Sequence, residues 1–312
     1  MNQNEIYQSI TDTIINALES NTESPLWQQQ WKIFAGNNHK SISKRPYQGV
    51  NQLICGIVAN ANNYNCKTWA TYNQWNKLGH KIKKGEKGTK IIKVLKIAKE
   101  EKDKITDKKI TKTFSTMKQF VVFNGDQTES YHEQQVTIPK QNWDISDFEM
   151  IDNRAKELGA KIVEGKNSCY FNPTDDYIGM PFKFQYEKAE HYYATFLHEL
   201  THWTDNPNRS PREEKIAKLL GGGKRFHPEN YAFEELVAEI GSAFLLSHYN
   251  LSSDAQMRED HIPYIKSWIS ALKNDNKLIV KASSYAQQAC NFITGVTHQL
   301  EKGEENELVN AG

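Results

Sequence analysis

A His-Glu-x-x-His segment in the C-terminal half of the chain could bind a metal ion and carry out hydrolysis. It reads His198-Glu199-Leu200-Thr201-His202. The two histidines are four residues apart, so in a helix both imidazoles would lie on one side, about one turn (~5.4 Å) apart. Two neutral ring nitrogens at that spacing can bind one divalent ion, and Glu199 can accept a proton from an activated water molecule. The segment therefore predicts a catalytic metal centre.

A catalytic zinc ion needs a third protein ligand, and a second helix offers one. Residues 231–245 have helical periodicity, and Glu235 and Glu239 lie four residues apart beside its apolar stripe. Carboxylates in such a place are costly to desolvate unless a cation or hydrogen bonds compensate. We expect Glu235 to bind the metal and Glu239 to hydrogen-bond a histidine ligand, with Glu234 as the alternative metal ligand. Zinc is the expected ion, and Mn²⁺ also suits two histidines and a glutamate.

Neither helix needs a metal for these residues to occur. Short His-Glu-x-x-His matches also occur in ordinary half-exposed helices, and paired glutamates also occur on solvated helix faces. The apolar residues around both motifs favour a buried site, because Tyr193, Phe196 and Leu200 recur at helical spacing around the first, and Leu236 and Val237 adjoin the second.

Length, cysteine content and hydropathy narrow the class of protein. A chain of 312 residues can form two domains with real cores. No apolar run is long enough to span a bilayer, and the first residues lack the apolar segment of a signal peptide. The four cysteines form no C-x-x-C pair, so they indicate neither a disulfide framework nor a cysteine zinc site. We expect a cytoplasmic protein without membrane attachment.

The net charge of +1 hides two halves of opposite sign. Residues 1–146 contain 21 Lys and Arg against 13 Asp and Glu, whereas residues 147–312 contain 18 against 25. Such a split predicts a module that binds a polyanion, joined to a module with a different role. We expect a single-stranded DNA-binding domain at 1–125, a polar linker at 126–146 and a second domain at 147–312.

Aromatic residues alternate with cationic residues in the basic half, as a single-stranded nucleic-acid site requires. Bases stack on exposed rings for roughly 1–3 kcal/mol each, and lysines follow the phosphates without reading sequence. The alternative is that the rings belong to the core and the lysines are only solvated, which is more common for any one tryptophan. The candidate DNA-binding residues are Lys44, Arg45, Tyr47, Trp69, Tyr72, Trp75, Lys83, Lys84 and Lys87.

Periodicity predicts an α+β protein, with a mixed α/β domain followed by a domain that has a small antiparallel sheet and the metal-binding helix. The charged residues 99–113 predict a long hairpin tip or a mobile loop, and residues 68–79 predict a strand end that turns into a short helix. The other predicted helices are 5–19, 53–59, 148–158, 262–272 and 283–293, and the other predicted strands are 91–97, 118–124, 168–172 and 177–180.

Short motifs in a fixed order give a more specific indication than any one of them alone. They are Trp-x-x-x-Trp (27–31), YQGVN (47–51), WATYNQ (69–74), KGEKG (84–88), VFN (122–124), MP (180–181), YYAT (192–195), HELTHWT (198–204) and EELVAE (234–239). In this combination the chain resembles the ArdC antirestriction proteins, which also form the amino-terminal part of TraC-type plasmid primases. The resemblance covers nearly the whole chain.

This resemblance implies an N-terminal single-stranded DNA-binding domain and a C-terminal zincin-like, SprT-like metallopeptidase domain. It implies His198 and His202 as metal ligands, Glu199 as the catalytic carboxylate, and Glu235 as a third, gluzincin-like ligand. The family is associated with conjugative plasmids, where it protects incoming DNA from host restriction. The expected partners are therefore single-stranded DNA and restriction endonucleases or other DNA-bound proteins.

The chain departs from the family pattern at two places, and two other functions stay open. Asp205-Asn206 stand where Gly-His is common, and His227-Pro228 stand where Gly-Asp is usual. Neither change touches the expected ligands, but both would alter the rim of the cleft, and His227 is an alternative extra ligand, though a simple loop histidine is favoured. The rival functions are a non-catalytic DNA-binding protein with a structural metal domain, and a host protease acting on DNA–protein crosslinks.

Overall fold

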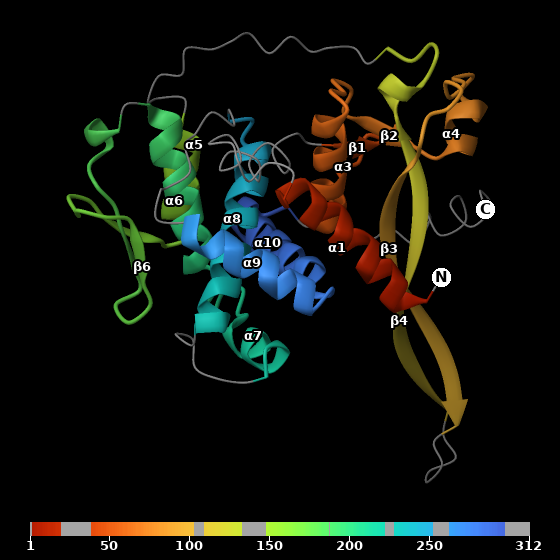
Figure 1. Cartoon of the computed structure of the whole chain (residues 1–312). Helices are drawn as coiled ribbons and strands as arrows, with labels where there is room; N and C mark the ends of the chain where they lie inside the picture. Colours follow the sequence, from red (N-terminus) through yellow and green to blue (C-terminus); the bar gives the residue numbers. More distant parts are fainter. Residues whose placement is uncertain are drawn as a thin grey trace.

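The structure, a computed structural model, describes residues 2–19, 39–102, 109–132, 148–186, 188–221, 228–251 and 262–296. The motif residues Trp27 and Trp31 and the loop residue His227 lie outside these ranges, and the expected linker is described only as far as residue 132. Both halves of the chain contain a small sheet and several helices, as the α+β prediction requires (Figure 1).

The N-terminal half contains a four-stranded sheet of order β1-β2-β4-β3, with β1 and β2 parallel and the other pairs antiparallel. Apolar residues of α3 pack on one face, because Cys55 and Ala59 contact Ile91 and Val122. The elements are α1 (Gln3–Glu19), β1 (Lys40–Ser41), α3 (Val50–Ala61), β2 (Thr68–Ala70), α4 (Tyr72–Lys77), β3 (Thr89–Lys102), β4 (Lys109–Asn124) and the short turn η2 (Gly125–Gln127).

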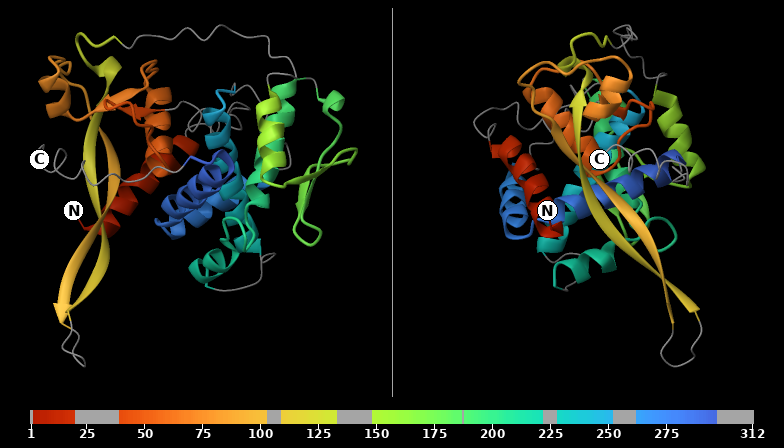
Figure 2. Two further views of the ribbon diagram at one scale, coloured as in Figure 1. Left: turned by 180° about the vertical axis from the view of Figure 1, so that it is seen from behind. Right: turned by 90° about the vertical axis from the view of Figure 1, so that its right-hand side faces the viewer.

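Strands β3 and β4 form a long hairpin. They pair continuously from Thr89 and Val122 to Lys102 and Lys109. Two further views show this ribbon projecting past the rest of the molecule (Figure 2). Residues 99–113, expected as a long hairpin tip or a mobile loop, are part of this hairpin, but 99–102 and 109–113 are paired strand residues rather than its tip, and 103–108 lie outside the described ranges.

Asn51 of the YQGVN motif joins α3 to the outer edge of this hairpin. Its amide nitrogen donates to the Ile92 carbonyl at 2.7 Å, and its amide oxygen accepts from the Ile92 N–H at 2.9 Å. The side chain thus replaces a neighbouring strand for one residue of β3, which is an edge strand with unpaired main-chain groups. The asparagine of this motif therefore has a structural role.

The C-terminal half is a helical assembly with a three-stranded sheet of order β5-β7-β6. The predicted strands are present, but the unpredicted β5 pairs parallel with β7, so this sheet is mixed and the prediction of an antiparallel sheet is wrong on that point. Three partly exposed residues give β5 no alternating pattern. The elements are α5 (Glu149–Glu157), β5 (Lys161–Val163), β6 (Tyr170–Asn172), β7 (Tyr177–Gly179), η4 (Lys183–Gln185), α6 (Ala189–Trp203), α7 (Glu213–Leu219), α8 (Pro228–His248), α9 (Ile262–Asn274) and α10 (Leu278–Thr294).

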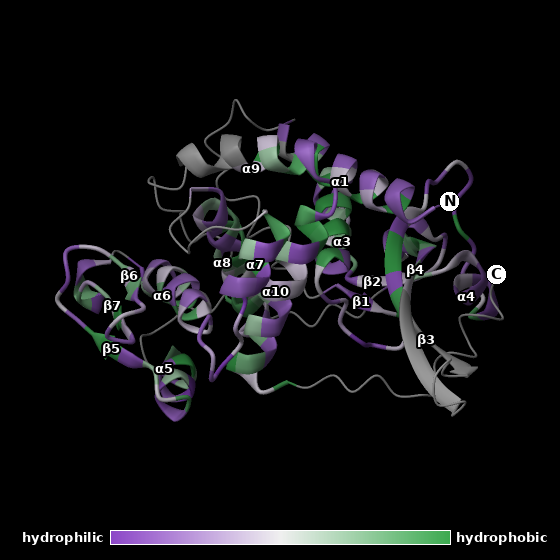
Figure 3. Cartoon of the chain, turned by 90° about the horizontal axis from the view of Figure 1, so that it is seen from below, coloured by the Kyte–Doolittle hydropathy of each residue, from purple (hydrophilic) through white to green (hydrophobic). Residues whose placement is uncertain are grey.

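The two halves share one apolar core. Residues of α1 and α3 belong to the same buried cluster as those of α8 and α10, and Figure 3 shows the largely apolar α3 between α1 and α10. Polar contacts support this packing, because Thr11 donates to the Asn276 carbonyl at 2.7 Å and the Gly49 N–H donates to Gln287 at 2.9 Å. The division into domains near residue 125 stays a prediction.

Helices α6 and α8 approach each other closely at Gly241. A Cβ atom there would lie 2.6 Å from Cγ2 and 3.0 Å from Oγ1 of Thr201, so only glycine fits. One residue further on, Ser242 donates to the Ala194 carbonyl of α6 at 3.0 Å. This approach lets side chains from the two helices meet.

Although α8 is 21 residues long, no helix in the described ranges, α8 included, has the length and the apolar composition needed to span a membrane.

We predict that Gly241→Ala separates α6 from α8 and lowers the free energy of unfolding by about 1–3 kcal/mol, the usual cost of overpacking a core. Thr201→Ser removes the methyl group nearest to the new Cβ and keeps the hydroxyl that donates to Leu197. The double variant should therefore recover part of the loss in urea denaturation. Equal stability of Gly241→Ala and the unmodified protein would show that the close approach is not needed.

Candidate metal centre

The two histidines of the His-Glu-x-x-His segment face each other on α6. They lie one turn apart on the helix, their ring centroids are 4.8 Å apart, and the rings are nearly perpendicular at 77°. The Nε2 atoms of His198 and His202 lie 3.1 Å from each other, and both side chains are buried. The predicted helical placement of the pair is thus present in the structure.

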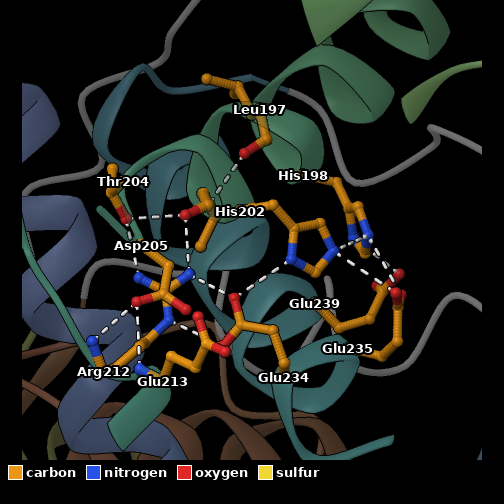
Figure 4. A network of polar contacts seen from close by, with 11 residues as sticks. Leu197, His198, His202, Thr204, Asp205, Arg212, Glu213, Glu234, Glu235 and Glu239 are labelled. Carbon is orange, nitrogen blue, oxygen red and sulfur yellow. Dashed lines mark hydrogen bonds and ion pairs between the residues drawn. The ribbon is translucent and has the colours of Figure 1, made fainter. Parts of the chain in front are cut away.

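Glu235 of α8 completes a group of three possible ligands (Figure 4). One carboxylate oxygen lies 3.4 Å from Nε2 of His198, and the other lies 3.5 Å from Nε2 of His202. Glu199 follows His198 on the same helix and is buried as well. The structure therefore brings together the three residues expected to bind the metal, although Glu235 lies more than thirty residues after the histidines in the sequence.

The separation of these donor atoms fits a divalent metal ion. Tetrahedral zinc with bonds of about 2.0–2.1 Å has ligand atoms about 3.3 Å apart. The two Nε2 atoms are 3.1 Å apart. The contacts of 3.4 and 3.5 Å go to different oxygens of Glu235, and one ligand atom from each of the three residues lies within 4.8 Å of the others. Two imidazoles and one carboxylate are also the protein ligands of one class of catalytic zinc sites. In distance and in chemistry, the three residues suit such an ion.

Each histidine has a carboxylate on its other ring nitrogen. Nδ1 of His198 lies 3.1 Å from Glu239, and Nδ1 of His202 lies 3.1 Å from Glu234. A carboxylate only accepts hydrogen bonds, so each Nδ1 is the ring nitrogen that keeps its hydrogen, and a ring that loses its other proton has the lone pair of Nε2 on the side of Glu235. Three acceptors then converge at one point, and a cation between them relieves their mutual repulsion.

These contacts separate the two candidates for the third ligand. Glu235 faces both Nε2 atoms, whereas Glu234 faces only the Nδ1 side of His202 and lies outside the group of possible ligands. Glu239 lies where the sequence-based interpretation placed it, beside a histidine rather than in the ligand group. The arrangement favours Glu235 as the metal ligand, and this role stays a prediction.

A buried arginine, Arg212, holds Glu234 in place. Its Nε donates to one Glu234 oxygen at 2.7 Å and its Nη2 donates to the other at 2.5 Å. The same guanidinium donates to the Thr204 hydroxyl and to the Thr201 carbonyl, both at 2.8 Å. Sequence reasoning missed this residue, because a loop arginine at this distance from the motif gives no periodic signal. The resulting chain of contacts runs from Arg212 through Glu234 to His202.

The departure at Asp205 explains how this arginine reaches the end of α6. One carboxylate oxygen of Asp205 accepts from the N–H groups of Arg212 and Glu213, at 2.7 and 3.1 Å. The loop also folds back on itself where the Ser210 N–H donates to the Thr204 carbonyl at 2.9 Å. Asp205 therefore anchors the start of α7 and orients Arg212.

The carboxylates make both histidines hold protons more strongly in the absence of metal. Burial by itself lowers the pKa of His198, but Glu239 and Glu235 reverse this and raise the pKa well above its usual value. Burial likewise lowers the pKa of His202, yet Glu235 and Glu234 raise it to about 9. The site thus attracts positive charge, whether as protons or as a metal ion.

The glutamates remain ionised for the complementary reason. Burial would raise the pKa of Glu234, but the guanidinium of Arg212 and the His202 ring lower it to about 2. The pKa of Glu235, which burial would also raise, is lowered by the two histidines. Both carboxylates are therefore negative at neutral pH.

A second arginine, Arg209, fixes the loop after α6 to the small sheet. It lies over the Trp203 ring at 3.9 Å from the ring centroid and forms two hydrogen bonds to Asp176, at 3.0 and 2.6 Å. Asp176 belongs to the turn between β6 and β7 and has a positive φ of 51°. This pair ties the loop that carries Arg212 to the sheet.

The expected DNA-binding tryptophans lie in the core. Trp69 and Trp75 are both 0% exposed. The indole N–H of Trp69 donates to His39 at 3.1 Å, and that of Trp75 donates to the Phe123 carbonyl at 2.9 Å. Without an exposed face neither ring can stack on a base, so the prediction for these two residues does not agree with their placement. Residues distant in the sequence, such as His39 and Phe123, bury these two rings, so the local sequence pattern does not predict their burial.

The other DNA-binding candidates remain at the surface to different degrees. Tyr72 is 53% exposed, whereas Tyr47 is half-buried and its burial raises the pKa of its hydroxyl. Lys83 donates to the Asp126 carbonyl at 2.8 Å, which attaches its loop to η2. The exposed cationic candidates are Lys44, Arg45, Lys83, Lys84 and Lys87. Their role in binding DNA stays a prediction.

Two family profiles match the chain, one in each half. The profile of the N-terminal domain of anti-restriction factor ArdC matches residues 4–123, and that of a zincin-like metallopeptidase matches residues 149–285. The second range contains all of the residues around the metal centre.

Solved structures and sequence relatives agree with these profiles. Antirestriction protein ArdC from plasmid R388 is 32% identical to this chain. Its metal-free structure has a TM-score of 0.73, with 92% of this chain and 96% of that chain covered. Its Mn(II)-bound structure has a TM-score of 0.70, with 93% of this chain and 97% of that chain covered. An uncharacterised protein, y4eC, of Sinorhizobium fredii is 28% identical over 96% of this chain and 95% of its own length. DNA primase TraC of Escherichia coli is 30% identical over 92% of this chain, which spans only 27% of the primase.

We predict that substituting the two adjacent glutamates has different effects, on metal binding in one case and on the free energy of unfolding in the other. Glu235→Gln should keep the fold and weaken metal binding by more than the 10- to 100-fold typical of losing an outer hydrogen-bond partner. Glu234→Gln should instead lower the free energy of unfolding by about 3–5 kcal/mol, because it leaves the buried charge of Arg212 uncompensated. Competition with a chromophoric chelator measures the first effect and urea denaturation the second. The reverse pattern would assign the ligand role to Glu234.

We also predict that the metal-free protein loses stability as the pH rises from 6.5 to 9. The pKa of His202 is raised from 6.5 to about 9 by folding, so its protonation stabilises the fold fully below pH 6.5, and that contribution disappears as the pH passes the folded value. Metal replaces protons at the same nitrogens, so the rise in Tm on adding zinc should grow over this range. Glu235→Gln should flatten the profile, and an equally steep profile in that variant would contradict this assignment.

Proposed function

The chain belongs to the ArdC family of antirestriction proteins, and from this membership we propose that it protects DNA entering a cell from restriction endonucleases. In the proposal it is encoded by a conjugative plasmid or another mobile element, acts in the cytoplasm and binds the entering DNA as a single strand. The similarity to ArdC of plasmid R388 over almost the full length of both chains supports the proposal, as does the similarity to a DNA primase.

The basic N-terminal half is the proposed DNA-binding part. It has eight more Lys and Arg than Asp and Glu up to residue 146, and the exposed lysines of the loop before β3 carry part of this charge. Lysines near phosphates release condensed counterions, which gives affinity without sequence preference. Binding without sequence preference suits an antirestriction protein, because the entering DNA has no fixed sequence.

We further propose that the C-terminal half is a metal-dependent peptidase. The observation that carries this proposal is the convergence of His198, His202 and Glu235, whose ligand atoms lie within 4.8 Å of one another, with Glu199 directly after His198 on the same helix. Zinc is the proposed ion, and manganese is the alternative, since a relative has an Mn(II)-bound structure. When bound, the ion would supply Lewis acidity toward a water molecule and the peptide carbonyl.

The residues of the chain then have separate tasks. Glu199 accepts the proton of the attacking water and returns it to the leaving amine. Glu239 and Glu234 keep the two imidazoles in one tautomer and one orientation. An extended peptide would lie along β6, an edge strand of the small sheet beside α6, through main-chain hydrogen bonds. Proteins bound to the entering DNA, restriction endonucleases among them, are the proposed substrates.

We predict that Glu199→Gln lowers the rate of cleavage of a DNA-bound protein by roughly 100- to 10,000-fold, the usual contribution of a general base. The variant should keep its metal and its affinity for DNA, which separates loss of chemistry from loss of structure. The measurement is cleavage of a restriction endonuclease on DNA with zinc or manganese, with a chelated sample as the control. Equal cleavage by both proteins would remove the proposed role of Glu199.

An antirestriction assay in cells separates the proposed function from its rivals. In one outcome, Glu199→Gln protects entering DNA as well as the unmodified protein does, whereas replacing Lys83, Lys84 and Lys87 by alanine abolishes protection. The protein then acts by binding DNA alone, and the metal centre is structural. If neither change affects entering DNA but Glu199→Gln blocks the removal of crosslinked proteins from DNA, the protein is a crosslink protease.

A further inference from the structure

Near Gly88 and Phe123, one face of the four-stranded sheet is not covered by α3. Further along β3 the same face is buried, because Ile92 belongs to the core shared with α1 and α3. Ile91 and Val122 point toward α3 and belong to its buried cluster. Because side chains alternate along a strand, Lys90 and Val121, which are opposite each other in the register, point to the other face, and so does Phe123. This second face lies next to α4, since the ring of Tyr72, the first residue of that helix, contacts the Phe123 ring.

An exposed apolar strip lies on this second face. Val121 and Phe123 cover Gly88 so closely that a Cβ atom there would lie 2.2 Å from Cγ1 of Val121 and 2.9 Å from Cζ of Phe123. The Tyr72 ring meets the Phe123 ring edge-on, at 6.4 Å between centroids and 64° between planes. Tyr72 is 53% exposed, Val121 is 46% exposed, and Phe123 is half-buried. We call Tyr72, Val121 and Phe123 the open-face strip.

An exposed lysine borders the open-face strip. Lys90 is the register partner of Val121 and points to the same face. Lys87, which is also exposed, precedes Gly88 in the loop before β3. The one acidic residue of the same loop, Glu86, accepts a hydrogen bond from Gln127 at 2.9 Å. The strip is therefore an apolar and aromatic surface with positive charge at its edge.

From this arrangement we propose that the open-face strip is the platform on which bases of single-stranded DNA stack, with Lys90 binding a neighbouring phosphate. The inference rests on the proposed DNA-binding function and adds the location of the site. Single-stranded DNA is the occupant that fits, because its unpaired bases offer flat apolar faces between negative charges. A duplex keeps its bases stacked inside and would contact only the lysines.

The strip also explains three motifs that the metal centre leaves unused. Tyr72 comes from WATYNQ, Gly88 from KGEKG and Phe123 from VFN, and all three meet at this point. Tyr72 is held at the first position of α4 by a capping box, in which Thr71 and Gln74 bond each other's main-chain N–H groups. The glycine gives Phe123 room to lie flat on the sheet.

The test measures binding of the full-length protein to a fluorescent oligothymidylate in a stated salt concentration. Tyr72→Ala should weaken affinity roughly 5- to 150-fold, the range for one base–aromatic stack. Tyr72→Trp should bind the oligothymidylate with about the affinity of the unmodified protein, because its ring can also stack on a base. The matched control is Phe184→Ala, which removes a still more exposed aromatic ring (80%) from the C-terminal half and should leave affinity unchanged.

Two further measurements separate stacking from charge and from damage to the fold. On a strand whose bases are replaced by abasic sites, Tyr72→Ala and the unmodified protein should bind equally, because no base is left to stack. Lys90→Ala should reduce the slope of log affinity against log salt by about 0.7, the value for one phosphate contact on a single strand. Tyr72→Ala should leave this slope unchanged, and so should Lys281→Ala, an exposed lysine of α10.

The outcomes distinguish the platform from the function it rests on. If the unmodified protein binds oligothymidylate and Tyr72→Ala binds it equally well, the platform is refuted while the DNA-binding function stands. If Tyr72→Ala weakens binding to the abasic strand by the same factor, the residue acts through the fold and the stacking role is also refuted. If the unmodified protein binds no single-stranded DNA, the proposed function itself fails.

Discussion

The close approach of α6 and α8 is the constraint on which the metal centre depends. Gly241 lets the helices come together at Thr201, so side chains from each reach a common point. At that point two imidazoles and three carboxylates are buried together, which would be costly if any one of them lacked its partners. Each histidine is instead held between Glu235 and a carboxylate on its opposite nitrogen. The helix packing and the polar network thus require each other.

The network extends beyond the immediate contacts of the histidines. Arg212 fixes Glu234, and Asp205 fixes the main chain of Arg212, so the loop after α6 determines how His202 is oriented. Arg209 ties this loop to the turn between β6 and β7. The centre, the loop and the small sheet therefore form one connected polar unit. A departure from the family pattern, the aspartate at 205, belongs to this unit rather than disturbing it.

The basic half and the zincin-like half pack against each other and share one core. Helix α1 packs beside α9, α3 contacts α10, and the Gly49 N–H bonds directly to Gln287. Three family motifs of the basic half meet on the uncovered side of its sheet, while the YQGVN motif faces the shared core and the edge of β3. Motif residues in this half therefore divide between surface and core, and only their placement shows which is which.

The sequence by itself determined the α+β class, most helices, and the position of His198 and His202 on one side of a helix, because periodic patterns and the spacing of four residues act along one helix. Only the tertiary structure favours Glu235 over Glu234 beside both histidines, since adjacent residues on α8 differ in direction by about 100° and their neighbours come from elsewhere. It also decided that Trp69 and Trp75 are core while Tyr72 is exposed, and it alone brought Arg212 to the centre. Burial and long-range hydrogen bonds depend on contacts between elements that are distant in the sequence, and a local sequence pattern does not predict those contacts.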